Sequence, residues 1–242
     1  MSGTLALPVI AVDGPAGSGK SSTSRAVAAR LGLRYLDTGA MYRALAWGML
    51  SRDVDVSDPT AVAAVAHQSE VAITTAPEGQ TVTCDGVDVT EDIRSQRVTS
   101  AVSAVSAVPE VRARLVDLQR QVVADALAAG VGIVVEGRDI GTVVLPDAML
   151  KVFLTADEAE RAYRRALEEA VRSGATDPES EAAEASAAVR ERLALRDSID
   201  SGRAASPLRP ADDAVVVEAT TLTLDQVVDR VIMLAEERLT HD

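Results

Sequence analysis

One glycine-rich segment restricts the folds open to this chain more than any other feature. Residues 14–21 read GPAGSGKS and fit the pattern G-x-x-x-x-G-K-[ST]. They follow an apolar run at residues 8–12 and precede an Ala-rich amphipathic stretch at residues 23–31, so the segment is predicted to join a buried strand to a helix. Glycines let successive backbone N–H groups turn toward one oxyanion, and the start of a helix adds partial positive charge. The segment therefore predicts a nucleotide phosphate site.

Each residue type in this loop suits phosphate binding. Lys20 can reach the β- and γ-phosphates, and the Ser21 hydroxyl can hold a magnesium ion. The chain has only two lysines, Lys20 and Lys151, and one of them falls at the position that the pattern requires. The residues expected to bind the donor nucleotide are Gly14, Pro15, Ala16, Gly17, Ser18, Gly19, Lys20, Ser21 and Ser22.

Further apolar runs indicate a parallel sheet. They lie at residues 131–135, 149–154 and 214–217, and each precedes a helical pattern; the last helix is expected at residues 224–239. Aromatic residues make up only 2%, so the core must be built from Ala, Val, Leu and Ile, which suit helices packed on a parallel sheet. We therefore predict an α/β fold in which helices flank a parallel sheet.

The middle of the chain follows another pattern. Between residues 70 and 90, short alternating segments surround Asp85-Gly86, a strong hairpin signal, and predict a small antiparallel sheet. We assign it to an inserted subdomain at residues 60–107 within one domain that spans residues 1–242. Residues 173–186 are rich in Ala, Glu and Ser and allow a solvated helix or a mobile lid. We place the lid segment at residues 157–180.

Composition excludes several classes of protein. The net charge of −13 disfavours non-specific binding of nucleic acid, and no stretch approaches the roughly 18 apolar residues that a membrane span needs. Cys84 is the only cysteine, so neither an intrachain disulfide nor a cysteine-based zinc site is expected. A metal would bind oxygen ligands, which favours Mg²⁺. The expected protein is cytoplasmic, with no membrane or nucleic-acid partner.

The motifs also separate a kinase from a regulatory switch. A GTPase would carry an N-K-x-D base-reading motif, which is absent, and Asp139-Ile-Gly141 has the wrong spacing for D-x-x-G. A kinase that phosphorylates an anionic acceptor instead needs arginines that converge from several segments. Any single arginine is more often a solvated surface residue. The candidates are Arg43, Arg112, Arg138, Arg196 and Arg203, with Arg161, Arg164 and Arg165 on one predicted helix.

Four segments together resemble the bacterial cytidylate kinase family. They are VIAVDGPAGSGKSS, YLDTGAMYRALA, EGRDIGTVVLPDA and RDSIDSGRAASPL, in that family's order and spacing. The first is shared by many phosphate-loop proteins, whereas the other three are far more specific. The resemblance covers nearly the whole chain, and it implies a P-loop kinase fold with an inserted acceptor-binding subdomain and a helical lid.

The resemblance also implies residue roles. Asp37-Thr38-Gly39 and Tyr42-Arg43 match the segment that lines the acceptor site, where Arg43 would hold the acceptor phosphate; Thr38 stands where relatives can have Ser. Ser103, Arg112 and Asp139 match positions that read the cytosine edge, and Asp200 matches a residue that binds the sugar hydroxyls. Substrate binding is also expected of three arginines that match positions near the phosphates, namely Arg138, Arg196 and Arg203. The expected catalytic residues are Lys20, Arg138, Arg164, Arg196 and Arg203.

The expected reaction transfers the γ-phosphoryl group of ATP to CMP, and to dCMP, with Mg²⁺ bound at Ser21, in a monomeric enzyme of pyrimidine nucleotide metabolism. Read from the residues alone, some roles stay open. Asp139 could be a helix N-cap or a magnesium ligand through water, and Ser103 could be one more serine of a helix. Another acceptor, such as UMP or a small phosphorylated metabolite, and a non-catalytic ATP-binding module are the alternatives.

Overall fold

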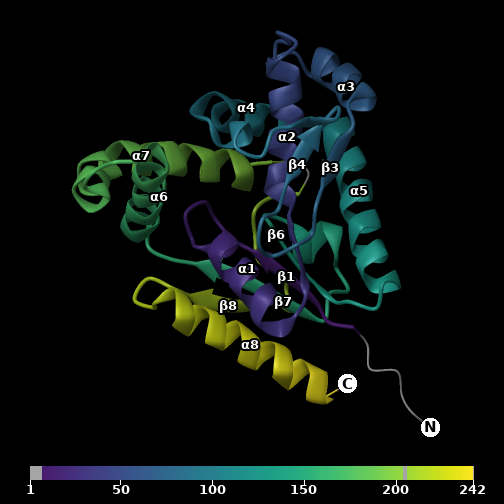
Figure 1. Ribbon diagram of the computed structural model, residues 1–242, viewed down its shortest axis with the longest axis vertical. Helices are drawn as coiled ribbons and strands as arrows, with labels where there is room; N and C mark the ends of the chain where they lie inside the picture. Colours follow the sequence, from purple (N-terminus) through teal and green to yellow (C-terminus); the bar gives the residue numbers. More distant parts are fainter. Residues whose placement is uncertain (1–6, 204–205, 242) are drawn as a thin grey trace.

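A five-stranded parallel sheet forms the centre of the computed structural model, which describes residues 7–203 and 206–241 (Figure 1). Residues 1–6 and 242 of the predicted domain, and Ala204 and Ala205 of the RDSIDSGRAASPL segment, lie outside the described residues. The strand order is β2-β6-β1-β7-β8, and every neighbouring pair is parallel. The strands are β1 (Val9–Asp13), β2 (Arg34–Asp37), β6 (Ile133–Gly137), β7 (Leu150–Thr155) and β8 (Val215–Glu218).

Helices cover both faces of this sheet. Side chains alternate along a strand, so Ile10 and Val12 pack with α1 (Lys20–Leu31) and α8 (Leu224–His241), whereas Ala11 belongs to the core on the opposite face. That opposite core contains the buried residues of α2 (Thr38–Leu50) and α5 (Pro109–Ala128). The predicted α/β fold with a flanked parallel sheet is confirmed.

The predicted strands lie within two residues of the observed ones, but β2 was not predicted. Its four residues, RYLD, contain only two apolar side chains and begin with an arginine, so no apolar run marks them. Pairing with β6 in the register Tyr35 to Val134 and Leu36 to Val135 nevertheless buries both residues completely. Tertiary pairing thus outweighs the weak local signal.

The predicted antiparallel sheet is also confirmed. It consists of β3 (Val71–Ile73), β4 (Val82–Cys84) and β5 (Val87–Asp88) in that order. Asp85 and Gly86 both have positive φ angles, of 51° and 78°, as the expected tight hairpin between β4 and β5 requires.

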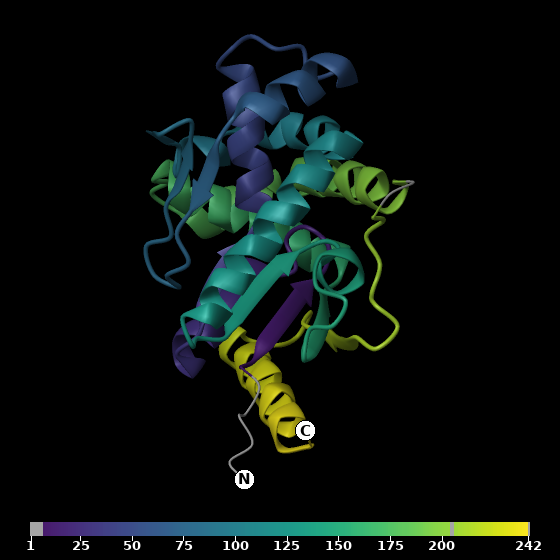
Figure 2. The same cartoon turned by 90° about the vertical axis from the view of Figure 1, so that its right-hand side faces the viewer.

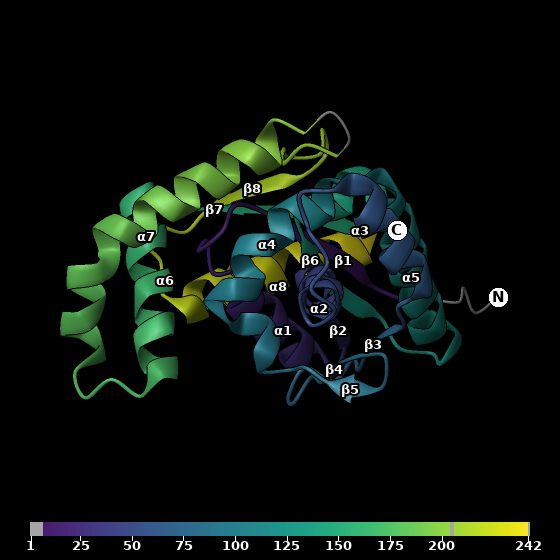
Figure 3. The same ribbon diagram turned by 90° about the horizontal axis from the view of Figure 1, so that it is seen from above.

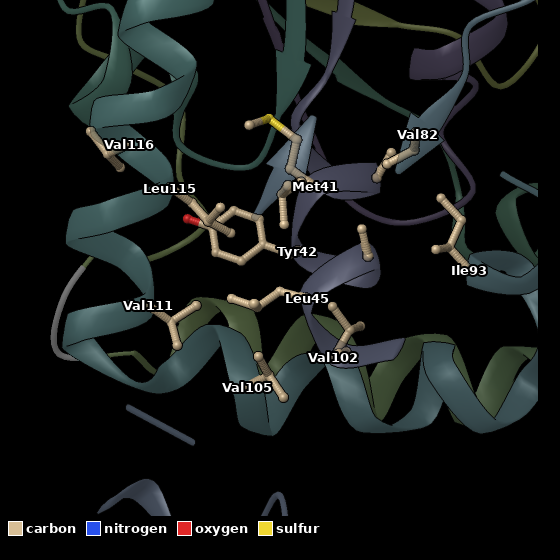
Figure 4. Close-up of a cluster of buried hydrophobic side chains, with 14 of the residues drawn as sticks. Met41, Tyr42, Leu45, Val82, Ile93, Val102, Val105, Val111, Leu115 and Val116 are labelled. Carbon is tan, nitrogen blue, oxygen red and sulfur yellow. The ribbon is translucent and has the colours of Figure 1, made fainter. Parts of the chain in front are cut away.

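The segment around this sheet shares its core with the rest of the domain. It contains α3 (Pro59–Gln68), the short 3₁₀ helix η1 (Asp92–Arg94) and α4 (Gln96–Ala107). Figure 4 shows Met41 and Leu45 of α2 among side chains from α4, α5 and β4. The hydrophobic core that includes them extends along α2 from the parallel sheet to the inserted segment. The boundaries at residues 60 and 107 stay a prediction.

Two antiparallel helices project beside the sheet, as seen from above in Figure 3. They are α6 (Glu158–Ser173) and α7 (Pro178–Ser201), and the small core between them, which contains Ala166 and Val189, also includes Ala16 of the glycine-rich loop. Gly174 ends α6 in the left-handed conformation. Residues 173–186 thus form the end of one helix, a turn and the start of the next. Within the described residues, no helix is long and apolar enough to cross a membrane.

Candidate functional site

A cavity of about 400 Å³ lies where the carboxyl ends of β1, β2 and β6 meet. Figure 2 shows the surrounding arrangement, with the insert above the sheet and α8 below it. Ligands of open α/β sheets bind at this edge. The predicted site residues that line the cavity are Ala16, Gly17, Gly19, Lys20, Ser21, Ser22, Thr38, Arg43, Ser103, Arg112, Arg138, Asp139, Arg196, Asp200 and Arg203.

Four predicted residues are not in the lining, although each lies close to it. Gly14 and Pro15 contribute backbone carbonyls that accept from Arg138 at 2.8 Å and from Lys20 at 2.7 Å. Ser18 is buried inside the loop. Arg164 binds Glu160 at 2.7 Å and the Ala219 carbonyl at 2.7 Å, so the structure places its guanidinium beside the loop after β8.

Close packing fixes the conformation of the phosphate loop. A Cβ added to Gly14 would lie 2.0 Å from the carbonyl oxygen of Leu154, and one added to Gly17, where φ is +76°, would lie 2.5 Å from that of Arg161. Neither distance is compatible with a side chain. The two glycines therefore let β7 and α6 approach the loop backbone directly.

Lys20 and Ser21 begin α1 at the base of the cavity. Burial and the positive charge of Arg138 together lower the pKa of Lys20 to about 7, while Glu136 opposes the change. Ser21 donates from its hydroxyl to Glu136 at 3.0 Å. The hydroxyl and the carboxylate are hard oxygen donors at the start of a helix, and this is the donor chemistry that Mg²⁺ prefers.

Glu136 connects this region to β2. Its other carboxylate oxygen accepts a short hydrogen bond from the hydroxyl of Tyr35, a fully buried residue. Burial raises the pKa of Glu136 to about 7, with a contribution from the negative charge of Asp37, while Lys20 opposes the rise. A carboxyl that titrates near neutrality is therefore placed next to the loop that is predicted to bind magnesium.

The start of α2 supplies the next part of the cavity. Asp37 caps this helix by accepting from the Ala40 N–H at 2.9 Å, and it pairs with Arg43 at 2.8 Å. Burial opposes ionisation, but Arg43 and the capping N–H outweigh it and lower the pKa of Asp37. Thr38 donates its hydroxyl to the Glu136 carbonyl at 2.7 Å, which connects the start of α2 to β6.

A buried ion pair occupies the far wall. Arg112 of α5 binds Asp139, which follows β6, and also donates to the Ser106 carbonyl at 3.4 Å. The Arg112 guanidinium lies 5.7 Å from the ring centroid of Tyr42, within the range of a cation–π contact. Ser103 of α4 lines the same wall. The three residues predicted to read the cytosine edge are thus brought together.

Three arginines gather around one carboxylate. Asp200 of α7 is almost fully buried and pairs with Arg203, with Arg138 at 3.2 Å and with Arg196 at 4.0 Å. Burial and the charge of Arg138 lower the pKa of Arg196 to about 9, and burial also lowers the pKa of Arg203. Arginine side chains keep their charge in proteins, so the cluster is strongly cationic and suits phosphate groups.

One carboxylate connects the phosphate loop to the segment that follows Asp139. Asp13 ends β1 directly before the phosphate loop, and it accepts from the N–H groups of Ile140 and Gly141, each at 2.8 Å. These residues begin the π-helical turn η2 (Ile140–Val144) immediately after Asp139. Burial raises the pKa of Asp13 to about 6, although the two N–H bonds oppose the rise.

Sequence reasoning missed several residues of the site. The residues without a predicted role include Asp13, Tyr35, Ser106, Glu136 and Asp197. Asp37 and Tyr42 line the cavity, as expected from their place in the segment that matches the acceptor site. Glu136 had a readable signal, because it ends the buried run that precedes Gly137-Arg138, where parallel strands present their functional groups. Tyr35 and Asp197 stand in segments that carry the resemblance, but no local pattern indicates their contacts, since their partners lie 101 and 181 positions away in the sequence.

Comparison with known proteins identifies the family of the chain. The family model described as "Cytidylate kinase" matches residues 10–237. A cytidylate kinase of Streptomyces avermitilis is 54% identical over 97% of this chain and 95% of its own length. One of Streptomyces coelicolor is 56% identical over 95% of this chain and 93% of its own length. The chain belongs to the cytidylate kinase family.

Proposed function

We propose that this protein transfers the γ-phosphoryl group of ATP to CMP, and to dCMP, to give ADP and CDP or dCDP. The observation that carries the proposal is the shared cavity, which places a phosphate loop, a cationic cluster and a buried Arg112–Asp139 pair within one space. A phosphate loop alone fits many nucleotide-binding proteins. The other two features fit a second, phosphorylated ligand that carries a base.

The donor phosphates are assigned to the phosphate loop and Lys20. The Lys20 ammonium donates to the Pro15 carbonyl, which holds it beside the backbone of the loop. Mg²⁺ would be held by Ser21, with Glu136 as the neighbouring carboxylate, and would neutralise charge on the β- and γ-phosphates. The Tyr35 hydroxyl fixes Glu136 from the opposite side.

The acceptor phosphate is assigned to Arg43, Arg138, Arg196 and Arg203. Phosphoryl transfer spreads negative charge over the transferring group, and arginines arranged in advance stabilise that charge without reorganisation. An acceptor phosphate is already ionised at neutral pH, so no general base is needed. Catalysis then consists of positioning and charge stabilisation.

Base recognition is assigned to Arg112, Asp139 and Ser103. A guanidinium can donate to the ring nitrogen and carbonyl of cytosine, and a carboxylate can accept from its exocyclic amine. A site that forms buried hydrogen bonds rejects a base that leaves them unpaired, by about 10⁴-fold or more. Asp200 is assigned to the sugar hydroxyls, held in place by its three arginines.

The proposal extends to closure and cellular context. Residues 157–180 act as a lid and residues 60–107 as an acceptor subdomain, and both close to keep water from the γ-phosphate. The enzyme works as a monomer in the cytoplasm, without a nucleic-acid partner; the net charge of −13 supports the last point.

A coupled assay of ADP release tests the proposal, with ATP, Mg²⁺ and each nucleoside monophosphate in parallel. We expect strong turnover with CMP and dCMP and little with AMP or GMP. Turnover with UMP or another acceptor alone would refute the base-reading roles of Ser103, Arg112 and Asp139. ATP binding without turnover of any acceptor would favour a binding module over a kinase.

A further inference from the structure

The peptide groups of Ala16, in the middle of the phosphate loop, are held from outside the loop. The Ala16 N–H donates to Asp197 Oδ1 at 3.2 Å, and the Ala16 carbonyl accepts from Arg161 Nη1 at 3.0 Å. The same Nη1 group also binds the other oxygen of Asp197. Arg161 and Asp197 therefore form an ion pair that encloses one residue of the loop from both sides.

This pair links the loop to the bases of both projecting helices. Arg161 lies in the first turn of α6, where its Nε also donates to the Ala156 carbonyl at 3.1 Å, and Asp197 lies near the end of α7. The backbone of α6 touches the loop as well, because a Cβ on Gly17 would lie 2.5 Å from the Arg161 carbonyl. The start of α6 and the end of α7 therefore both contact the phosphate loop directly.

Burial distinguishes this pair from the other ion pairs of the hairpin. The side chains of Arg161 and Asp197 are 10% and 16% exposed. A second pair between the same two helices, Arg190 with Glu158 at 3.0 Å, is 57% exposed on both sides and does not contact the loop. Exposed pairs contribute little, whereas hydrogen bonds to buried charges fix geometry.

We infer that Arg161 and Asp197 are positioning residues for the donor nucleotide: they hold the Ala16 peptides so that the following N–H groups of the loop face the phosphates. The inference rests on the proposed function for its kinetic consequences. A loop whose binding groups are backbone N–H groups has few side chains of its own to hold it, so contacts from α6 and α7 supply the restraint. Through the same contacts, a movement of α6 and α7 would also change the conformation of the loop.

Arg161 is the better residue to change, because Asp197 also lies 3.7 Å from Arg138, which is assigned to the acceptor. We expect Arg161→Gln to weaken ATP binding by about tenfold, the size that follows from lost hydrogen bonds to a charged group. The KM for CMP should stay within about twofold of the wild-type value.

Amide hydrogen exchange of residues 14–20 should become faster in the absence of nucleotide. Arg161→Lys keeps the charge but not the forked geometry, and it should show a smaller loss of ATP affinity.

Arg190→Gln is the matched control, because it breaks the exposed α6–α7 pair and leaves the loop contacts in place. The inference is overturned if Arg161→Gln lowers only the melting temperature, with ATP affinity and exchange of residues 14–20 unchanged, or if Arg190→Gln has the same effects. If Arg161→Gln does not fold, Arg161→Lys decides between the same outcomes. Wild-type protein that binds ATP but does not phosphorylate CMP would refute the proposed function, whereas ATP affinity and exchange would still test the inference.

Discussion

The phosphate loop and the acceptor side of the cavity are built in opposite ways. The loop is one continuous run, GPAGSGKS, whose backbone N–H groups are proposed to supply most of the binding groups. The acceptor side gathers side chains that lie as far apart in the sequence as Arg43, which belongs to α2, and Arg203, which follows the end of α7. The first design depends on close packing around glycines, and the second depends on networks of paired charges. Substitutions should therefore affect the two halves in different ways.

Lys20→Ala should have the largest effect, because Lys20 is the side chain on which the backbone-built half depends. We expect turnover to fall by about 10²–10³-fold, as it does when a group that stabilises transition-state charge is removed. The fold should persist, as circular dichroism and thermal unfolding would show. Near-normal turnover in this variant would refute the assignment of the phosphate loop.

Asp13→Asn tests the connection between the phosphate loop and the segment at Ile140 and Gly141. The folded-state pKa of Asp13 is raised from 3.8 to about 6, so between these values the native protein binds this proton more tightly than the unfolded chain. The free energy of unfolding attributable to Asp13 therefore falls as pH rises through that window, by about 3 kcal/mol in all. Asparagine does not titrate, so the wild type should lose about this amount relative to the variant between pH 3.5 and 7.

Urea unfolding of both proteins across this range measures the difference. The variant also loses one acceptor for the N–H groups of Ile140 and Gly141, but that cost does not change with pH. A difference between the two proteins that stays constant from pH 3.5 to 7 would contradict the assignment of a protonated Asp13 to the native state.

Asp139→Asn should affect the acceptor half alone. It leaves Arg112 buried without its charged partner, and we expect the KM for CMP to rise by about 30-fold, which corresponds to about 2 kcal/mol. The KM for ATP should change by less than about twofold. Asp213→Asn is the control, because Asp213 pairs with Lys151 and is mostly exposed. Equal increases in both KM values would show that the halves are not separable.

Asp200→Ala should have the smallest effect of these four substitutions. We expect the KM for CMP and dCMP to rise by about tenfold. Three arginines lose a shared carboxylate, so the cluster becomes less ordered although its positive charge increases. Steady-state kinetics with each acceptor measure the change. An unchanged KM for both nucleotides would remove the sugar-binding role.

The same contrast explains what the sequence could predict. The phosphate loop follows from a local pattern, and so do the flanking strand and helix, because their apolar runs are continuous. The hairpin at Asp85-Gly86 is equally local. Strand β2 could not be predicted, because its burial depends on pairing with β6, about 100 residues later.

The sequence offered Arg43 and Arg112 among several candidate arginines, but their roles, and Asp200 itself, came only from the family resemblance, since no spacing rule brings these three residues together. The residues that hold the site in place were missed for the same reason. Tyr35, Asp13 and Asp197 each act through a partner more than 100 positions away, and their residue types are common in unremarkable roles.

The most direct test of the account asks whether donor and acceptor occupy the cavity together. A bisubstrate analogue, in which adenosine and cytidine are joined through five phosphates, should compete with both ATP and CMP and bind far more tightly than either nucleotide. Competition with both substrates is the result that the shared cavity predicts. An analogue that competes with ATP alone, with an affinity no better than that of ATP, would contradict it.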